Sequence, residues 1–89
     1  MEVEIGKVMH YYDHIQVAVL LLSGVVKLGD EIHIQGHATD FSQRIASIEV
    51  DHENILWAKP GDNVAIKVDQ PVHVHDLVYT VIEQVAEPG

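Results

Sequence analysis

The sequence predicts an all-β fold, a barrel or a sandwich, and three observations lead to this prediction. A Gly29-Asp30 turn is followed by residues 31–35, in which isoleucines alternate with polar residues. The same phrase returns at Gly61-Asp62, which precedes the alternating residues 63–68. No segment has a sustained helical period. Two turn-strand units of this kind are typical of small all-β domains.

Size and composition point to a compact binding module. The 89 residues are expected to form one domain, 1–89, that buries roughly 60–65% of the surface of its unfolded chain and leaves little room for a deep cleft. The absence of cysteine excludes disulfides, thiolate metal sites and cysteine nucleophiles. The longest aliphatic run, residues 17–22, is too short for a membrane span. We therefore expect a soluble, cytoplasmic protein with no membrane partner.

The charge is strongly negative. Fourteen acidic residues against five basic ones give a formal net charge of −9, and the acids are spread along the whole chain. Binding to a phosphate backbone depends on clustered lysine and arginine, so direct binding of bare nucleic acid is not expected. Seven histidines make the field pH-dependent, because protonating all of them would bring −9 to −2.

The first predicted strand bends at a glycine. Apolar residues change parity after Gly6, which indicates a β-bulge there. Tyr11 and Tyr12 near the end of this strand are predicted to contribute to the core and cap its rim, with ligand stacking as the alternative. Asp13-His14 is the expected turn into the second strand.

The second predicted strand, residues 16–22, is apolar on both faces. Val17, Val19 and Leu21 lie opposite three further apolar residues. Such a strand needs a cover on each side. Either it crosses the most enclosed part of the domain, or the Val17 face meets a partner, which includes a second copy of this chain.

The middle of the chain predicts one bent strand and an apolar knot. Apolar and polar residues alternate at the end of the segment 41–50. Ile45 lies three residues before Ile48 and so has the opposite parity, which predicts a bulge near Ala46-Ser47. Residues 51–54 predict a charged turn rather than an acid-base set. Trp57, in the knot at 55–58, is predicted to plug one mouth of the domain, with an exposed partner contact as the alternative.

The last strand is predicted at residues 76–85, after a segment that carries two histidines. His73 and His75 are two residues apart and Asp76 follows, so all three are weak candidates for a metal site. Two imidazoles and one carboxylate are fewer than the four ligands of structural zinc, so no bound metal is expected. His33 and His37 are predicted to be solvated. No serine has triad spacing, so no catalytic residue and no cofactor are expected.

Several motifs together resemble the second-domain β-barrel of translation elongation factors such as elongation factor Tu. The order and spacing of these motifs carry the resemblance: Gly6-Lys7-Val8, Gly24, the run Lys27-Leu28-Gly29-Asp30-Glu31-Ile32-His33-Ile34-Gln35-Gly36, Ile48, and the run Ala58-Lys59-Pro60-Gly61-Asp62-Asn63-Val64-Ala65-Ile66. Within that superfamily, Thr39-Asp40-Phe41-Ser42-Gln43, Ser47 and Asp76-Leu77-Val78-Tyr79-Thr80-Val81 are most similar to stand-alone elongation-factor-like proteins and to the C-terminal barrel of collagenase-like peptidases.

The resemblance implies a small, closed, six- or seven-stranded barrel of the translation-protein type. It does not imply an activity, because the chain has no G-x-x-x-x-G-K-[ST] phosphate loop and no peptidase domain. Transfer-RNA-holding residues of the factors cannot be placed here. One position departs from the relatives, which tend to have glycine before the last aspartate, where this chain has His75.

These observations predict a non-catalytic binding module that acts on a protein or ribonucleoprotein partner. Val17, Val19, Leu21 and Trp57 are the predicted partner-binding residues. The alternatives are an accessory subunit that completes a peptidase-like or RNA-modifying enzyme in trans, and a small histidine-based metal-binding protein.

Overall fold

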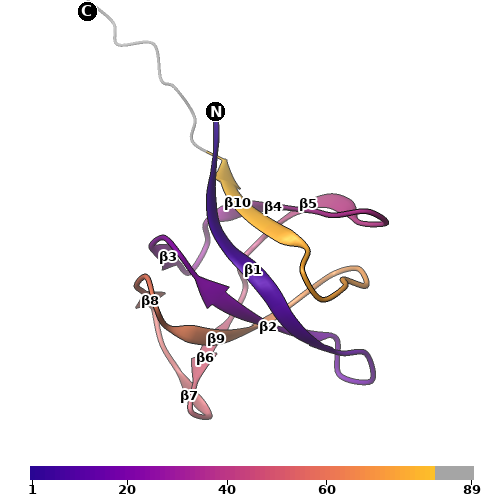
Figure 1. The fold of residues 1–89 in the computed structure, drawn as a ribbon. Helices are drawn as coiled ribbons and strands as arrows, with labels where there is room; N and C mark the ends of the chain where they lie inside the picture. The colour runs from indigo at the N-terminus through magenta and orange to yellow at the C-terminus, as the bar shows by residue number, and fades with distance from the viewer. Residues whose placement is uncertain (82–89) are drawn as a thin grey trace, which may run out of the picture.

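The computed structural model describes residues 1–81, and every regular element among them is a β-strand (Figure 1). Within these residues no helix has the length and apolarity needed to cross a membrane. Six of the ten strands have five or more residues. The strands are β1 (Glu2–Tyr12), β2 (Val17–Leu22), β3 (Val26–Lys27), β4 (Glu31–Gln35), β5 (Asp40–Arg44), β6 (Ile48–Val50), β7 (Glu53–Asn54), β8 (Trp57–Ala58), β9 (Asn63–Lys67) and β10 (Leu77–Val81).

Eight of these strands form one sheet in the order β5-β4-β10-β1-β2-β9-β6-β7, and β3 pairs with β8 in a second, two-stranded sheet. All the pairs are antiparallel. The long strand β1 bends from β10 toward β2 (Figure 1). Within residues 1–81 no ladder joins the end strands β5 and β7, so backbone pairing alone establishes an all-β fold with an open sheet order.

The bend in β1 occurs at the predicted glycine. The register between β1 and β10 shifts between Glu4 and Gly6, which confirms a bulge. A Cβ on Gly6 would lie 3.0 Å from the carbonyl oxygen of Leu21, so a side chain there would crowd the neighbouring strand. A second shift, between Val8 and His10, bends the strand again along its pairing with β2.

The core is built from alternate residues of the strands. Ala18, Leu20 and Leu22 of β2 are buried, whereas Val17 and Val19 are half-buried and Leu21 is exposed. The predicted strand 63–68 likewise buries its even-numbered apolar positions. The largest side chains with almost no exposure are Leu20, Ile32, Ile34, Ile45, Ile48 and Ile66. Alternation in the sequence therefore reports which face of each strand is covered.

The single bent strand predicted at residues 41–50 is wrong. The structure places two strands there, since β5 pairs with β4 whereas β6 pairs with β9 and β7. Ile45 and Ile48 are both buried although they differ in parity, because the chain crosses from one part of the sheet to another between them. The final strand is confirmed from Leu77 to Val81, and the rest of the predicted strand, 82–85, lies outside the described residues.

Three strands begin after the same aspartate-closed turn. At 27–30, 59–62 and 73–76, the N–H of the aspartate donates to the carbonyl of the first residue, at 3.0–3.1 Å. In return, the carboxylate accepts the N–H of that first residue, at 2.8–3.2 Å. The aspartates are Asp30, Asp62 and Asp76, and they precede β4, β9 and β10.

The third copy of this turn has a histidine where the other two have glycine. Gly29 and Gly61 adopt φ of +88° and +92°, and His75 adopts +79°. His75 therefore keeps the left-handed backbone geometry of the other two copies. A side chain is strained at positive φ, because its Cβ approaches the backbone. The sequence shows only two copies of the turn because His75 hides the third.

A buried glutamine joins two distant parts of the sheet. Gln43 of β5 donates from Nε2 to the carbonyl of Lys67 at 2.9 Å and accepts the N–H of Asp69 at 2.7 Å. Lys67 ends β9, which four strands separate from β5 in the sheet order. The amide of Gln43 thus makes backbone-like contacts with a strand that is not its ladder partner.

We predict that His75→Gly stabilises the protein by about 0.5–1 kcal/mol, because relief of left-handed strain outweighs the entropy cost of glycine. Urea unfolding measures the difference. Gly29→Ala and Gly61→Ala are matched controls and should destabilise by a similar amount. A Cβ at either glycine meets nothing within 4 Å, so any stability that the alanine variants lose comes from backbone strain and not from a clash. If His75→Gly is no more stable than the wild type, the backbone of His75 is not strained.

Candidate functional site

An apolar surface lies where β3 and β8 pair. Trp57 of β8 is opposite Lys27 of β3, and the N–H of Leu28 donates to the carbonyl of Leu56 at 2.9 Å. Leu56 is 71% exposed and Trp57 is 58% exposed. We call this region the Trp57 surface, and its residues are Leu28, Ile55, Leu56 and Trp57.

Two hollows adjoin this surface. One, of about 290 Å³, lies among Leu28, Ile48 and Ile55. The other, of about 450 Å³, is lined by Leu56, Trp57 and neighbouring residues that include Lys59 and Asp62. The interpretation of Trp57 as a plug is wrong, because more than half of this residue is in solvent. The exposed position agrees with the alternative, a contact for a partner.

The other predicted partner-binding residues lie on a different surface. Val17, Val19 and Leu21 are on the outer face of β2, and Val19 lines a hollow that also includes Tyr12. None of the residues that line this hollow borders the two beside Trp57. Tyr11 packs against the core, whereas Tyr12 is 49% exposed. The four predicted residues therefore divide between two surfaces.

The structure brings two of the three candidate metal ligands near each other, since His73 Nδ1 lies 3.8 Å from Asp76 Oδ2. The carboxylate of Asp76 accepts the N–H of His73 at 2.8 Å, and His73 Nδ1 makes a hydrogen bond with Thr39 Oγ1 at 3.0 Å. His75 is exposed. Across residues 1–81, no three histidine, aspartate or glutamate side chains are arranged to hold a metal ion. The aspartate serves the turn, as its two counterparts do.

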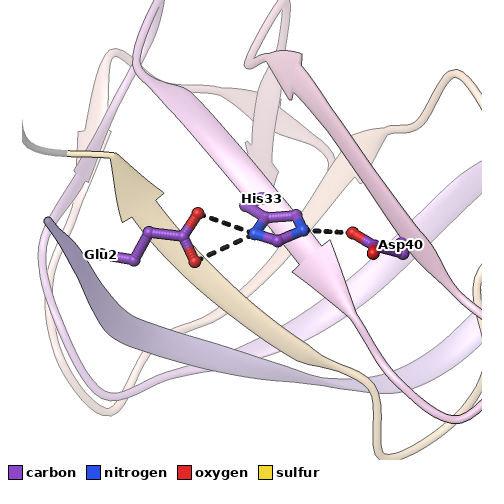
Figure 2. Close-up of polar contacts among 3 residues, drawn as sticks. All are labelled: Glu2, His33 and Asp40. Atoms are coloured by element: carbon purple, nitrogen blue, oxygen red, sulfur yellow. Dashed lines mark hydrogen bonds and ion pairs between the residues drawn. The ribbon is translucent and has the colours of Figure 1, made fainter.

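The structure reveals an ion-pair cluster that sequence reasoning missed. His33 of β4 lies between the carboxylates of Glu2 in β1 and Asp40 in β5 (Figure 2). Its Nδ1 is 2.8 and 2.9 Å from the two oxygens of Glu2, and its Nε2 makes a hydrogen bond with Asp40. Only 17% of the His33 side chain is exposed. The prediction that His33 is solvated is therefore wrong.

The cluster favours the charged imidazole. The hydrogen bond to Asp40 raises the pKa of His33 above its ordinary value of 6.5 and that to Glu2 adds to the effect, while burial opposes both. Both ring nitrogens are held by carboxylates, so neither is free to take a proton from a substrate. The cluster ties β1, β4 and β5 together across the face of β10, whose Tyr79 pairs with His33.

The sequence signal for the cluster was weak. Glu2 and His33 are 31 residues apart, and only the register of β1, β10 and β4 brings them together. Asp40 could have been found from a hairpin prediction, because Gln35 pairs with Asp40 and His33 is its diagonal neighbour on the same face.

The fold and these surfaces define a small antiparallel β module with an exposed apolar surface. The family model of elongation factor Tu domain 2 matches residues 16–70, so the chain belongs to this family. It is 32% identical over 85 residues to a Methanocaldococcus jannaschii protein named "uncharacterized protease MJ0090", a match that covers 94% of this chain and 21% of that relative. The chain therefore spans about a fifth of the curated relative.

Solved structures agree on the fold. The C-terminal domain of a putative U32 peptidase from Geobacillus thermoleovorans superposes with a TM-score of 0.83 at 22% identity, covering 88% of this chain and 91% of that one. Its selenomethionine variant gives 0.81 at 23% identity, covering 85% and 96%. The resemblance to elongation factor Tu domain 2 and to the C-terminal domain of this peptidase group is thus confirmed.

We predict that the His33 cluster stabilises the fold only while His33 is charged. Folding raises its pKa, so the contribution is full below pH 6.5 and is lost as pH rises through the higher, folded pKa. His33→Gln should cost up to about 1 kcal/mol at pH 6, with solvent screening included, and much less at pH 9. Urea unfolding of both proteins at both pH values measures this.

His37→Gln is the control for this comparison, since His37 is an exposed loop residue. It should change stability little at either pH. An equal loss at pH 6 and pH 9 for His33→Gln would show that packing, and not charge, holds the three strands.

Proposed function

We propose that this chain is a non-catalytic docking module that binds a protein surface, in a protein or ribonucleoprotein partner, through the Trp57 surface. One observation carries the proposal: Leu56 and Trp57 stand more than half exposed beside two hollows. Burying such side chains is worth about 1.5–3 kcal/mol each. Tryptophan is also among the residues that most often dominate binding energy at protein interfaces.

The chemistry of the described residues supports a role without catalysis. His33 has both nitrogens bound to carboxylates, and the carboxylate of Asp76 accepts a backbone N–H inside a turn. A general base needs a free lone pair near its substrate, which His33 lacks in this arrangement. The printed sequence also has no phosphate loop for GTP.

We also infer that the sheet closes into a barrel of the translation-protein type, with the amide of Gln43 as part of the closure. This side chain links β5 to the end of β9, so the edge strand β5 and the far side of the sheet are held together. Closed barrels have no free sheet edge, which suits a chain that presents its side chains to a partner.

Gln43→Leu tests the closure. Leucine leaves the N–H of Asp69 and the carbonyl of Lys67 without the contacts that Gln43 provides, so we expect a loss of about 2–3 kcal/mol in urea unfolding. Amide hydrogen exchange at Asp69 should also accelerate. Gln35→Leu, an exposed position on the neighbouring strand, is the control. If amide hydrogen exchange at Asp69 is unchanged in Gln43→Leu, the Gln43 side chain does not hold β5 to the end of β9.

A second candidate is an accessory unit that completes a peptidase-like enzyme in trans. The observation that favours it is the match of 94% of this chain to a relative named as a protease, together with the likeness to the C-terminal domain of a putative peptidase. In this version the Trp57 surface binds a separate catalytic chain. The two candidates share the surface and differ in the partner.

We predict that the double variant Leu56→Ser, Trp57→Ser stays folded and binds its partner at least tenfold more weakly, a loss of about 1.4 kcal/mol or more. The immobilised protein is incubated with native cell extract at low salt, and mass spectrometry quantifies the retained proteins. Ile15→Ser is the matched control, because Ile15 is 59% exposed in the turn between β1 and β2.

The retained proteins also separate the two candidates. A single catalytic chain of the peptidase type supports the accessory unit, whereas ribosomal or other assemblies support the general docking module. If wild type, control and double variant retain the same proteins in the same amounts, the Trp57 surface is not the docking site.

A further inference from the structure

The outer face of the large sheet carries a hollow that the Trp57 surface does not share. Its floor follows the register of the strands, because Ala65 of β9 pairs with Val19 of β2 on one side and with Glu49 of β6 on the other. Ala65 contributes only a methyl group between two larger neighbours. The hollow of about 290 Å³ lies over this small residue.

An aromatic side chain forms one side of the hollow. Tyr12 lines it and is 49% exposed, so this residue is accessible to a ligand. The ring of His10 lies edge-on to Tyr12, with centroids 4.2 Å apart and planes at 64°. This contact restrains the tyrosine at the end of β1.

Carboxylates stand among the other lining residues. Glu49 belongs to β6, and Asp51 occupies the two-residue turn between β6 and β7. Asp51 and His52 both have positive φ, as a type I′ hairpin requires, so the turn has a defined shape. Neither lysine nor arginine lines the hollow. The nearest lysine along β9 is Lys67, two residues after Ala65, and it pairs with Val17.

The charge of the whole chain agrees with this local charge. Fourteen acids against five bases give a field that attracts cations to the surface, most strongly where carboxylates border an apolar hollow. Among residues 1–81, the carboxylates of Glu49 and Asp51 make no hydrogen bond and no ion pair, whereas those of the three turn aspartates accept backbone N–H groups. Their carboxylates are therefore available to a partner.

We infer that this hollow, the Tyr12 slot (Tyr12, Val19, Glu49, Asp51 and Ala65), binds an arginine side chain on a basic segment of a partner protein. The methylene stem lies on the floor of Val19 and Ala65. The guanidinium reaches the tyrosine ring and the two carboxylates. Arginine combines the flat cation and multiple donors that this set of groups can use, and 290 Å³ is at the small end for a ligand site, which suits one side chain.

The inference deepens the proposed function and rests on it only in taking the ligand to be a protein. It assigns the partner a basic segment and gives the outer face of β2 a separate role from the Trp57 surface. It also gives Val19, one of the predicted partner-binding residues, a role that does not require self-association of this chain.

A tetra-arginine peptide is the probe, titrated into the full chain at pH 8, where histidines in general carry little charge. Two-dimensional NMR follows the backbone amides. We expect shifts centred on Val19, Ala65 and Asp51, and a tetra-citrulline peptide, which keeps the shape and lacks the charge, should bind at least tenfold more weakly. Binding should also weaken as salt is raised.

Variants then separate recognition from net charge. Glu49→Gln with Asp51→Asn should weaken binding at least tenfold, and asparagine tolerates the left-handed backbone at residue 51. The matched control, Glu4→Gln with Asp69→Asn, removes two charges elsewhere and should weaken binding less than threefold. Tyr12→Leu should reduce the affinity while the fold is kept.

Three results would overturn the inference: equal weakening by the matched control, equal affinity for the citrulline peptide, or shifts centred outside the slot. The Leu56→Ser, Trp57→Ser variant distinguishes this failure from that of the proposed function. It should bind the arginine peptide as the wild type does, since those residues do not line the slot. If that variant lost peptide binding, the Tyr12 slot would not bind arginine independently of the Trp57 surface, and the inference would be wrong.

Discussion

The aspartate-closed turn is the constraint on which the rest of the fold depends. Each copy fixes where a strand begins, because the aspartate both donates to and accepts from the backbone of the first turn residue. The copy that ends at Asp76 also shapes its surroundings, since a Cβ on Gly36 would lie 1.8 Å from its Oδ1. Glycine at 36 is therefore required by the buried carboxylate, and the end of β4 packs directly against the start of β10.

The acidic residues of this chain divide by what their carboxylates contact. The turn aspartates are used by backbone N–H groups, and Glu2 and Asp40 are used by His33. These acids stabilise the fold and contribute less to recognition, because their lone pairs already have donors. Glu49 and Asp51 face the hollow beside Tyr12 instead. A net charge of −9 thus has a structural part and a part available to a partner.

Two surfaces with different chemistry give the module its proposed role. The Trp57 surface is apolar and depends on a short pairing outside the main sheet, whereas the Tyr12 slot lies on the main sheet and combines an aromatic ring with carboxylates. An apolar anchor supplies affinity, and a charged site supplies orientation and selectivity. Membership of the elongation factor Tu domain 2 family establishes the kind of β module on which this proposal rests.

The sequence by itself determined the all-β class, the strands after Gly29-Asp30 and Gly61-Asp62 and the bulge at Gly6, because strand period and turn chemistry act between near neighbours. It also identified the β2 face and Trp57 as candidates, since runs of apolar residues are visible without a structure. Only the tertiary structure decided the division of residues 41–50 into two strands, the pairing of Glu2 with His33 and the slot over Ala65. Each of these depends on which strands become neighbours, and that choice is made by packing between residues far apart in the chain.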